Sequence, residues 1–239
     1  MSLRTEYDTW HKKYHDANPF YDDTSTPWYQ WVAGSIGNVD GLRTLEVACG
    51  RGGLVRKLAR SAALSCGLDF SFAAVSIGKE RWKEMDEGSP ASFTQGDAQE
   101  LPFPDAYFDV VISCETIEHL PSPVKALREF HRVTRNEGRL LLTTPNYLNF
   151  MGLYELYAKI RHPERKPDQP FDRVQLFTQV REQVNAAGWK IIRSDGTVHQ
   201  VPIWPGRNPV RLTSLESNVR LRKLLSIFAL HYCLIAKKK

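Results

Sequence analysis

Short apolar runs alternate with segments of helical spacing from residue 42 to residue 144. Apolar runs bounded by turn residues are typical of strands buried on both faces, and strands that alternate with helices form parallel sheets. The pattern therefore predicts an α/β doubly wound fold. Its first five strands are expected at Leu42–Val47, Ala63–Leu68, Ser92–Gln95, Phe108–Cys114 and Arg139–Thr144.

The expected helices have recognisable ends. A glycine-rich turn opens the first, Gly53–Ser61, and Ser71 is placed to cap the second. A third begins after Pro123 and ends at the turn Asn136–Gly138, and a further helix between the third and fourth strands is left open. The apolar face of the third helix has a spacing of three residues and consists of Val124, Leu127, Phe130 and Val133.

Two more strands are expected downstream. Thr178 is placed to cap a helix that Gly188 closes, and the strand Trp189–Ser194 follows it. The last strand is predicted at Phe228–Ala236. We expect a single domain over residues 1–239: residues 41–144 are its core, residues 1–40 a lid, and residues 145–177 and 199–226 cover the substrate. Near-helical spacing in the first covering segment involves Phe150, Leu153, Tyr154, Tyr157 and Ile160.

Composition agrees with one globular domain. The 239 residues are 42% hydrophobic and 25% charged, which excludes a disordered or collagen-like chain. The four cysteines show no CxxC spacing, so we expect reduced thiols, no metal site and a cytoplasmic location. The start lacks an apolar leader, and the apolar stretch Leu224–Ala236 is shorter than the ~20 residues that span a bilayer.

Positive charge is concentrated near the end of the chain. From Trp204 onward, eight lysines and arginines face one acidic residue, Glu216, whereas the preceding part holds 24 basic and 26 acidic residues. A basic segment of this kind contacts an acidic substrate, a nucleic acid or a membrane surface, or it is simply solvated. We expect no nucleic-acid partner, because the rest of the chain is slightly acidic; peripheral membrane contact through this region stays open.

The segment Thr44–Leu54 reads TLEVACGRGGL, a strand that opens through glycines into a helix. The dinucleotide pattern GxGxxG is not complete, because Val55 stands where the third glycine belongs. The phosphate-binding GK[ST] does not follow the glycines either. Glu46 at the strand end would repel phosphate and attract a cationic ligand. Asp69 and Asp97 follow the next two strands. All three acids are expected at the carboxyl edge of the sheet, where such folds bind ligands.

Together these motifs resemble class I S-adenosylmethionine-dependent methyltransferases, of the small-molecule type found in ubiquinone and menaquinone biosynthesis. The matching pieces are LEVACGRGG, GLDFS, GDAQELPFPDAYFDVVIS, CETIEHL and EGRLLLTTPN. The resemblance covers residues 42–144 and implies a Rossmann-like sheet of seven strands, mostly parallel with an antiparallel last strand. It also implies S-adenosylmethionine as cofactor and S-adenosylhomocysteine as product.

The resemblance assigns roles to residues around that cofactor. It places Glu46 and the backbone of Ala48, Cys49 and Gly50 at the methionine part, with alanine at position 48 where the family motif has glycine. Asp69 would bind the ribose hydroxyls and Phe70 would pack on adenine. Asp97 and Ala98 would receive the amino edge of the adenine, with Gln99 as a further cofactor-binding residue. Cys114 would line the floor of the site. Trp10 and Tyr14, four residues apart on an N-terminal helix, would close over the cofactor.

Methyl transfer needs few protein groups, because the sulfonium already makes the methyl carbon electrophilic and the enzyme mainly aligns the acceptor. A general base matters when the acceptor is a hydroxyl. His119 is the candidate, although an acid-His-Leu element at this place recurs in the family with diverse substrates. The other candidates for contact with the substrate are Glu115, Tyr147, Tyr154, Asp172 and His199, of which the last two and Tyr147 are fallback bases.

The leading hypothesis is methylation of an oxygen of a small or lipid-like metabolite, since the covering segments are rich in aromatics. The alternatives are N- or O-methylation of a sugar or other polar intermediate, and a catalytically inactive cofactor-binding scaffold. The near-complete first motif and both downstream acids argue against the scaffold. A nicotinamide oxidoreductase would be distinguished by binding a dinucleotide.

Overall fold

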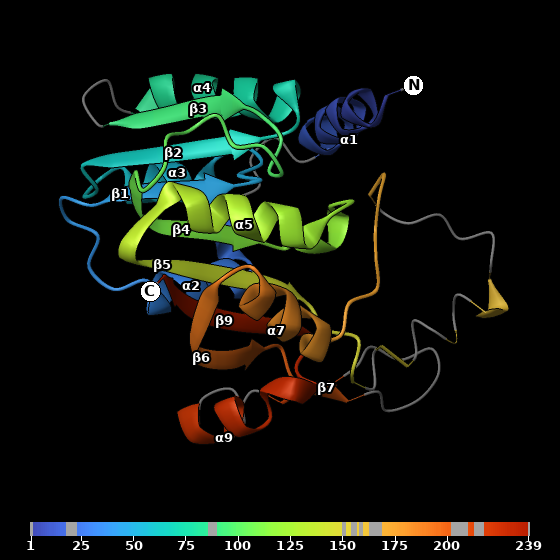
Figure 1. Ribbon diagram of the computed structural model, residues 1–239. Coiled ribbons are helices and arrows are strands. Elements are labelled where there is room, and N and C mark those ends of the chain that lie inside the picture. Colours follow the sequence, from blue (N-terminus) through green and yellow to red (C-terminus); the bar gives the residue numbers. More distant parts are fainter. Residues whose placement is uncertain are drawn as a thin grey trace.

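The computed structural model describes residues 2–17, 23–85, 90–149, 152–153, 157, 160–162, 169–201, 210–212 and 218–238. The main sheet has seven strands in the order β3-β2-β1-β4-β5-β9-β6 (Figure 1). β9 runs antiparallel to both of its neighbours, which confirms the predicted fold class. The strands are β1 Arg43–Val47, β2 Leu64–Asp69, β3 Ala91–Gln95, β4 Phe108–Cys114, β5 Thr134–Pro145, β6 Trp189–Thr197 and β9 His231–Lys238. A separate pair consists of β7 Gln200–Val201 and β8 Val210–Arg211.

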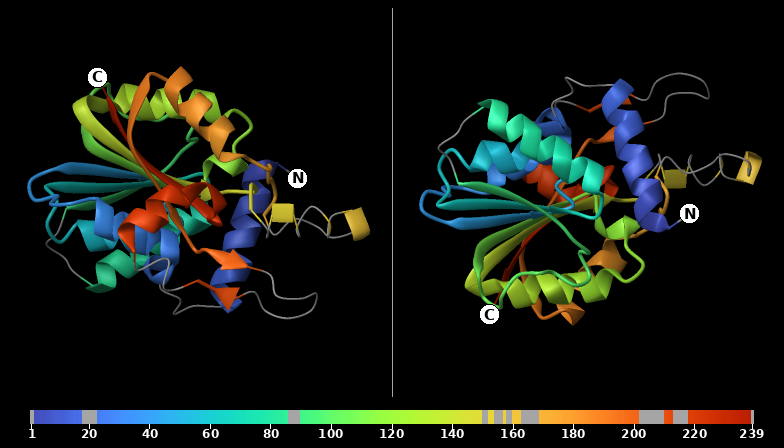
Figure 2. Two further views of the ribbon diagram at one scale, coloured as in Figure 1. Left: turned by 90° about the horizontal axis from the view of Figure 1, so that it is seen from below. Right: turned by 90° about the horizontal axis from the view of Figure 1, so that it is seen from above.

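Helices cover both faces of the sheet (Figure 2). α5 Pro123–Val133 and α7 Phe177–Ala186 lie on one face, where the predicted apolar stripe of α5 is buried. α2 Pro27–Ser35, α3 Gly53–Leu58 and α4 Phe72–Met85 lie on the other. The two apolar layers make the sheet the centre of the core, because its strands are buried on both sides.

Parallel register brings several loops to one edge. Val47 pairs with Leu68 on one side and with Ser113 on the other, and Asp69 pairs with Gln95. The residues that follow these strands therefore leave the sheet at the same level, at its carboxyl edge. Ligand sites of doubly wound folds lie in this place.

Helix α1, Leu3–Ala17, lies across this edge beside α4 (Figure 2). Asp8 Oδ1 accepts hydrogen bonds from the Ser71 hydroxyl at 2.7 Å and from the Ala73 N–H at 3.1 Å. Burial raises the pKa of Asp8, but these bonds outweigh it and hold the pKa below its usual value. Ser71 caps α4 as predicted, since its hydroxyl accepts from the Ala74 N–H. A carboxylate at a helix N-terminus is favourable, so Asp8 fixes the lid helix on α4.

Within the predicted lid, α2 belongs to the core. Trp31 and Val32 are buried against the sheet, and the Trp31 indole donates to Asp195 at 3.1 Å. Among the described lid residues, those that line the cavity at the carboxyl edge all belong to α1. Between the two helices, Asp23–Ser25 forms a short 3₁₀ turn, η1.

Three predicted boundaries are corrected by the structure. α7 begins at Phe177, so Thr178 is inside the helix and not its cap; the Gln179 side chain accepts from the Leu176 N–H instead. β9 begins at His231 and not at Phe228, because Ser226–Phe228 forms the 3₁₀ turn η3. β5 begins at Thr134, and the expected turn lies inside it, with a register shift opposite β4.

The helix left open between β3 and β4 is not formed in this fully described stretch. The loop is held instead by α5: the Arg132 guanidinium donates to the carbonyls of Leu101 and Phe103, and Glu129 accepts from the Leu101 N–H. These bonds satisfy backbone groups that a helix would have paired internally. The loop therefore packs on α5 as it crosses from the end of β3 to the start of β4.

The two substrate-covering segments are described in part. Leu153, Tyr157 and Ile160 are exposed, so the structure does not show them as a buried stripe, and Phe150 and Tyr154 lie outside the described residues. The second segment contains α9, Val219–Leu224, followed by η3. Among the described residues, the structure contains no helix with the length and apolarity needed to cross a bilayer.

Candidate active site

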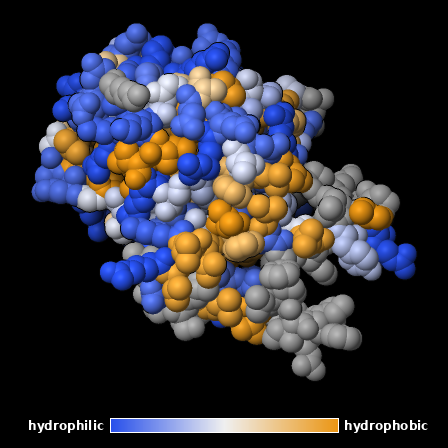
Figure 3. All heavy atoms as spheres, turned by 60° about the horizontal axis from the view of Figure 1, so that its bottom comes forward, coloured by the Kyte–Doolittle hydropathy of each residue, from blue (hydrophilic) through white to orange (hydrophobic). Residues whose placement is uncertain are grey.

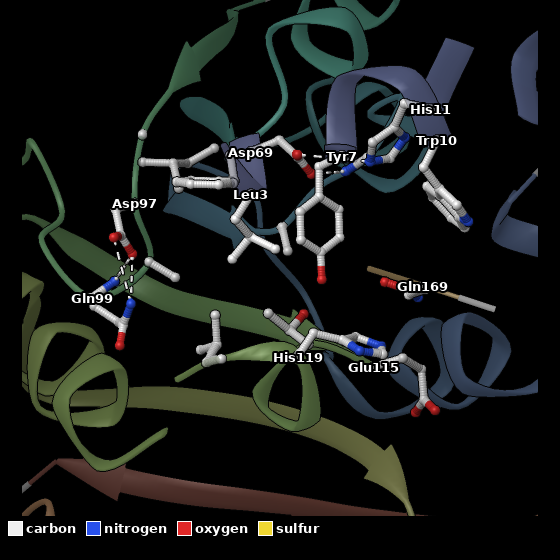
Figure 4. A pocket seen from close by; sticks show the side chains of 18 of the residues that line it. Leu3, Tyr7, Trp10, His11, Asp69, Asp97, Gln99, Glu115, His119 and Gln169 are labelled. Carbon is white, nitrogen blue, oxygen red and sulfur yellow. Dashed lines mark hydrogen bonds and ion pairs between the residues drawn. The ribbon is translucent and has the colours of Figure 1, made fainter. Parts of the chain in front are cut away.

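A cavity of about 270 Å³ opens at the carboxyl edge of the sheet (Figure 4). The loops after β1, β2, β3 and β4 form its floor and sides, and α1 covers it. Residues far apart in the chain therefore meet here because the parallel strands end together. The lining residues that carry polar side chains are Tyr7, Trp10, His11, Asp69, Asp97, Gln99, Glu115, Thr116, His119 and Gln169.

The turn after β1 is fixed by a carboxylate of the next strand. The Gly50 N–H donates to Asp69 Oδ2 at 2.8 Å, and the Ser71 N–H donates to Oδ1 at 2.9 Å. Ala48 has φ +57° and Gly50 has φ +51°. A non-glycine residue in the left-handed region costs roughly 1–2 kcal/mol, so the alanine that replaces the motif glycine is strained. Both residues line the cavity with little bulk.

The side next to β3 is polar. Asp97 Oδ1 accepts from the Gln99 N–H at 2.8 Å and from its side-chain amide at 3.2 Å. The side-chain oxygen of Gln99, Oε1, in turn accepts from the Ser122 N–H, at the start of α5. Phe70 forms the neighbouring apolar wall, edge to face with Tyr7 at 6.2 Å between ring centroids. The carboxylate is thereby oriented before any ligand arrives.

On the β4 side, Glu115 pairs with a residue of β9. Glu115 Oε2 lies 2.8 Å from His231 Nδ1, and the His231 ring packs against Trp28 of α2. Burial lowers the pKa of His231, but the Glu115 carboxylate outweighs it and raises the pKa above its usual value. Glu115 itself adopts φ +48°. Its second carboxylate oxygen, Oε1, is buried and has no hydrogen-bond partner in the described part of the chain.

His119 lies in the short 3₁₀ turn η2, Ile117–His119, after β4. Its Nδ1 is 2.7 Å from the Phe171 carbonyl oxygen, and Asp172 Oδ1 lies 3.9 Å from the same nitrogen. A carbonyl only accepts, so Nδ1 carries the proton and Nε2 of the neutral ring is an acceptor. Burial lowers the pKa of His119 and favours this neutral form.

Glu118 lies behind His119 and is buried. Its Oε2 is 3.0 Å from the Thr144 hydroxyl, and its Oε1 is 3.6 Å from His119 Nε2, beyond hydrogen-bond range. Burial, and then the nearby Glu115 carboxylate, raise the pKa of Glu118 well above its usual value. This side of the cavity therefore holds closely spaced groups that titrate abnormally, which is typical of functional sites.

Tyr7 of α1 faces this group. Its hydroxyl points toward His119 across the cavity (Figure 4). Burial raises the pKa of Tyr7 to about 12, so the hydroxyl remains a hydrogen-bond donor at neutral pH. The described lining contains three carboxylates, Asp69, Asp97 and Glu115, and neither lysine nor arginine. The electrostatics of the cavity favour a cationic or neutral ligand over an anionic one.

Comparison with known proteins identifies the family. Residues 45–142 match the family described as "Methyltransferase domain". The chain is 31% identical over 191 residues to a demethylmenaquinone methyltransferase of Renibacterium salmoninarum, covering 73% of this chain and 78% of that protein. The chain belongs to the class I S-adenosylmethionine-dependent methyltransferases.

Two further relatives agree with this assignment. A ubiquinone biosynthesis O-methyltransferase of Alkalilimnicola ehrlichii is 32% identical over 136 residues, which are 56% of this chain and 51% of that one. The crystal structure of a "possible histamine N-methyltransferase" from Thermotoga maritima has a TM-score of 0.71 at 16% identity, covering 100% of both chains. At that identity the structure shows a shared fold.

S-adenosylmethionine is the cofactor of this methyltransferase, and the cavity fits it. The lining carboxylates suit the positive sulfonium, and no lining lysine or arginine of the described chain opposes it. A Cβ added to Gly50 would meet no atom of its surroundings closer than His11, at 3.9 Å, so a ligand can approach this backbone. Among the described residues, no group of three or more histidines, cysteines or acids is arranged to hold a metal ion.

The structure brings most of the predicted site residues together. Those that line the cavity are Trp10, Ala48, Gly50, Asp69, Phe70, Asp97, Ala98, Gln99, Glu115 and His119. Asp172 lies at the back of His119. Their individual roles toward cofactor and acceptor remain proposals.

Other predicted residues lie outside the cavity lining. Glu46 is buried behind it, where the Tyr29 hydroxyl donates to its Oε1 at 2.7 Å. Cys49 and Cys114 are buried in the apolar layers, and Tyr14 stacks on Trp10 at 5.4 Å. Tyr147 follows β5 half-buried, and Tyr154 is outside the described residues. His199 is buried near η3, with Nε2 3.3 Å from the Leu225 carbonyl.

Several residues of the site were not predicted from the sequence, among them Tyr7, Asp8, His11 and His231. Tyr7 and His11 are four residues apart and lie on the same side of α1 as Trp10, so helical spacing from Trp10 was the available signal. Asp8 and His231 carry no local signal, because their partners are 63 and 116 residues away.

Proposed function

We propose that this methyltransferase transfers the methyl group of S-adenosylmethionine to a hydroxyl oxygen of a small, apolar or lipid-like metabolite by in-line displacement. The observation that carries the proposal is the tautomer of His119. His119 lines the cavity, and with its Nδ1 donating to Phe171 its Nε2 is unprotonated in the neutral ring. A hydroxyl acceptor needs such a base, whereas an unprotonated amine does not.

The residues of the chain would act as follows. When bound, S-adenosylmethionine supplies an electrophilic methyl group on a sulfonium. Asp69 would bind the ribose hydroxyls and Asp97 the adenine amino edge, and these contacts would orient the cofactor. His119 Nε2 would accept the proton of the acceptor hydroxyl as the oxygen–carbon bond forms and the carbon–sulfur bond breaks, which leaves S-adenosylhomocysteine as the product. The Phe171 carbonyl then stabilises the protonated ring through Nδ1, and Asp172 adds a favourable charge nearby.

Helix α1 would exclude water during this step. Leu3, Tyr7 and Trp10 cover the cavity from the lid side, and Leu120 and Pro121 line the wall beside His119. These apolar groups favour an apolar acceptor. Two of the relatives described above are named for menaquinone and ubiquinone biosynthesis, and lipid-like acceptors at this site are consistent with those names. Such acceptors partition into membranes, so membrane contact by the basic C-terminal region is part of the proposal.

The test has two stages. Calorimetric titration with S-adenosylhomocysteine should show saturable binding at one site, with NADH as a control that does not bind. Transfer from a labelled methyl donor is then compared on a prenylated phenol, its methyl ether and a matching amine. Labelling of the phenol alone supports the proposal. Labelling of the amine in preference to the phenol would overturn the oxygen specificity, and cofactor binding without transfer to any acceptor would favour the scaffold.

A further inference from the structure

Helix α9 has its polar and apolar sides inverted relative to an ordinary surface helix. Surface helices bury an apolar stripe and expose charges. Among the described side chains of α9, the one that turns inward is that of Arg222, whose guanidinium donates from Nε to Asp195 Oδ1 and from NH2 to Oδ2, both at 3.0 Å. Asp195 is completely buried in β6. A charged contact therefore fixes the inward side of the helix.

The outward side of the same helix carries large apolar residues. Leu221 is 44% exposed and Leu224 is 74% exposed, and Phe228 of η3 is 50% exposed. Leu221 and Leu224 are three residues apart and lie on one side of α9, and Phe228 ends the turn η3 that follows the helix. Figure 3, which brings the lower side of Figure 1 forward, shows hydrophobic residues gathered on this face.

The orientation of this segment is strongly fixed. Asn218 caps α9 by accepting from the N–H groups of Arg220 and Leu221. In η3, Ser226 is buried against β6, where a Cβ on Gly196 would lie 2.9 Å from the Ser226 Cα. Only glycine permits this close approach. The segment cannot rotate its leucines inward without breaking the Arg222–Asp195 pair and this contact.

Positive charge borders the apolar side. Arg220 precedes Leu221 and Lys223 precedes Leu224 on α9, and both basic side chains are exposed. Exposed apolar side chains among cations match the interface of an anionic bilayer, where apolar groups enter the acyl boundary and cations contact the headgroups. A second copy of the chain would present the same cations to each other around a symmetry axis, which is unfavourable.

We propose that α9 and η3 form a docking surface for an anionic membrane, with Leu221, Leu224 and Phe228 inserted at the headgroup boundary and Arg220 and Lys223 on the lipid phosphates. The inference rests on the proposed function only for its purpose, which is to bring the enzyme to a lipid-like acceptor. Docking itself needs neither cofactor nor acceptor. The buried Arg222–Asp195 pair holds the helix in the orientation that docking requires.

The test is co-sedimentation of the full chain with vesicles of phosphatidylglycerol or of phosphatidylcholine. We expect binding to the anionic vesicles and little to the neutral ones. R220Q/K223Q should bind roughly 30-fold more weakly, since each basic residue near an anionic surface contributes about fivefold. The control K79Q/K83Q removes the same charge from exposed positions of α4, at the other end of the sheet, and should bind like the wild type.

The apolar part is tested with L224D/F228D, which should abolish sedimentation, and with F72D, an equally exposed phenylalanine of α4, which should not. S-adenosylhomocysteine titration of every variant verifies folding and separates a docking failure from a failure of the proposed function. Binding of wild type and L224D/F228D to equal extents would overturn the proposal. So would a dimer seen by analytical ultracentrifugation that L224D/F228D dissolves while vesicles do not bind, since the occupant would then be a second copy.

Discussion

The two sides of the cavity are built differently. On the β1–β3 side, the N–H groups that hold the carboxylates come from residues at most 19 positions away: Gly50 and Ser71 donate to Asp69, and Gln99 donates to Asp97. On the β4 side, Glu115 is held by His231 and His119 by Phe171, which are 116 and 52 residues away. The first side is therefore built from neighbouring loops, and the second from segments much farther apart in the chain.

The difference also concerns hydrogen bonding. The described β4 side leaves Glu115 Oε1 and Glu118 Oε1 buried without partners, and buried polar atoms are normally satisfied. Of these two residues, Glu115 lines the cavity, and an unsatisfied acceptor beside a cavity is suited to a ligand that brings a donor. This favours a division in which the β1–β3 side is shaped for one invariant cofactor and the β4 side for a hydroxyl-bearing acceptor.

The largest expected effect is on kcat and comes from His119, which lies on the β4 side of the cavity. H119Q should lower kcat on a hydroxyl acceptor by roughly 10²–10⁴-fold, because the proton acceptor is lost. The affinity for S-adenosylhomocysteine should stay within about twofold by calorimetry. In the wild type, kcat should fall as the pH drops through a value below 6.5, because burial lowers the pKa of His119. H131Q, on α5 against Trp189, is the control. Unchanged kcat in H119Q would make this histidine a packing residue.

The second effect should appear on the opposite side only. D69A removes a carboxylate proposed to bind two ribose hydroxyls and shown to fix the Gly50 turn. With charged hydrogen bonds worth ~1.5–3 kcal/mol, affinity for S-adenosylhomocysteine should fall on the order of 100-fold. D40A changes an exposed aspartate and should leave the titration unaltered. Retained affinity in D69A would contradict the assignment of this side to the cofactor.

The third effect tests whether the Glu115–His231 pair, which joins distant segments on the β4 side, makes the free energy of unfolding depend on pH. The folded-state pKa of His231 is raised, so the Glu115 pair contributes stability that is fully present below the unfolded value near 6.5 and lost as pH rises through the folded value. H231Q should therefore cost about 1–3 kcal/mol in urea unfolding at pH 6 and less at pH 9. An equal cost at both pH values would show that the charge on His231 is unimportant.

The smallest effect concerns the lid that both sides share. D8A removes the acceptor for the Ser71 hydroxyl and the Ala73 N–H, so α1 should dock less firmly on α4. A lost cap costs ~1 kcal/mol, which corresponds to about fivefold in affinity for S-adenosylhomocysteine. D16A, exposed at the other end of α1, is the matched control. Equal affinities in D8A and D16A would mean that the lid closes independently of this contact.

The sequence by itself determined the order of strands and helices, the capping of α4 by Ser71 and the acids at the ends of β2 and β3. These features depend on apolar periodicity and on contacts within a few residues. The same reasoning erred at α7, β5 and η3, where the ends are decided by packing: Ser226, for example, is held against Gly196 of β6.

Only the tertiary structure decided the β4 side of the cavity, the lid and the inverted face of α9. Glu115 meets His231 because β9 runs antiparallel beside β5, and Asp8 meets Ser71 because α1 crosses the carboxyl edge. The orientation of α9 is likewise set by another element, because Arg222 donates to Asp195, a buried residue of β6 that also accepts from Arg193 of the same strand. A buried carboxylate needs charged partners, and these two arginines supply them.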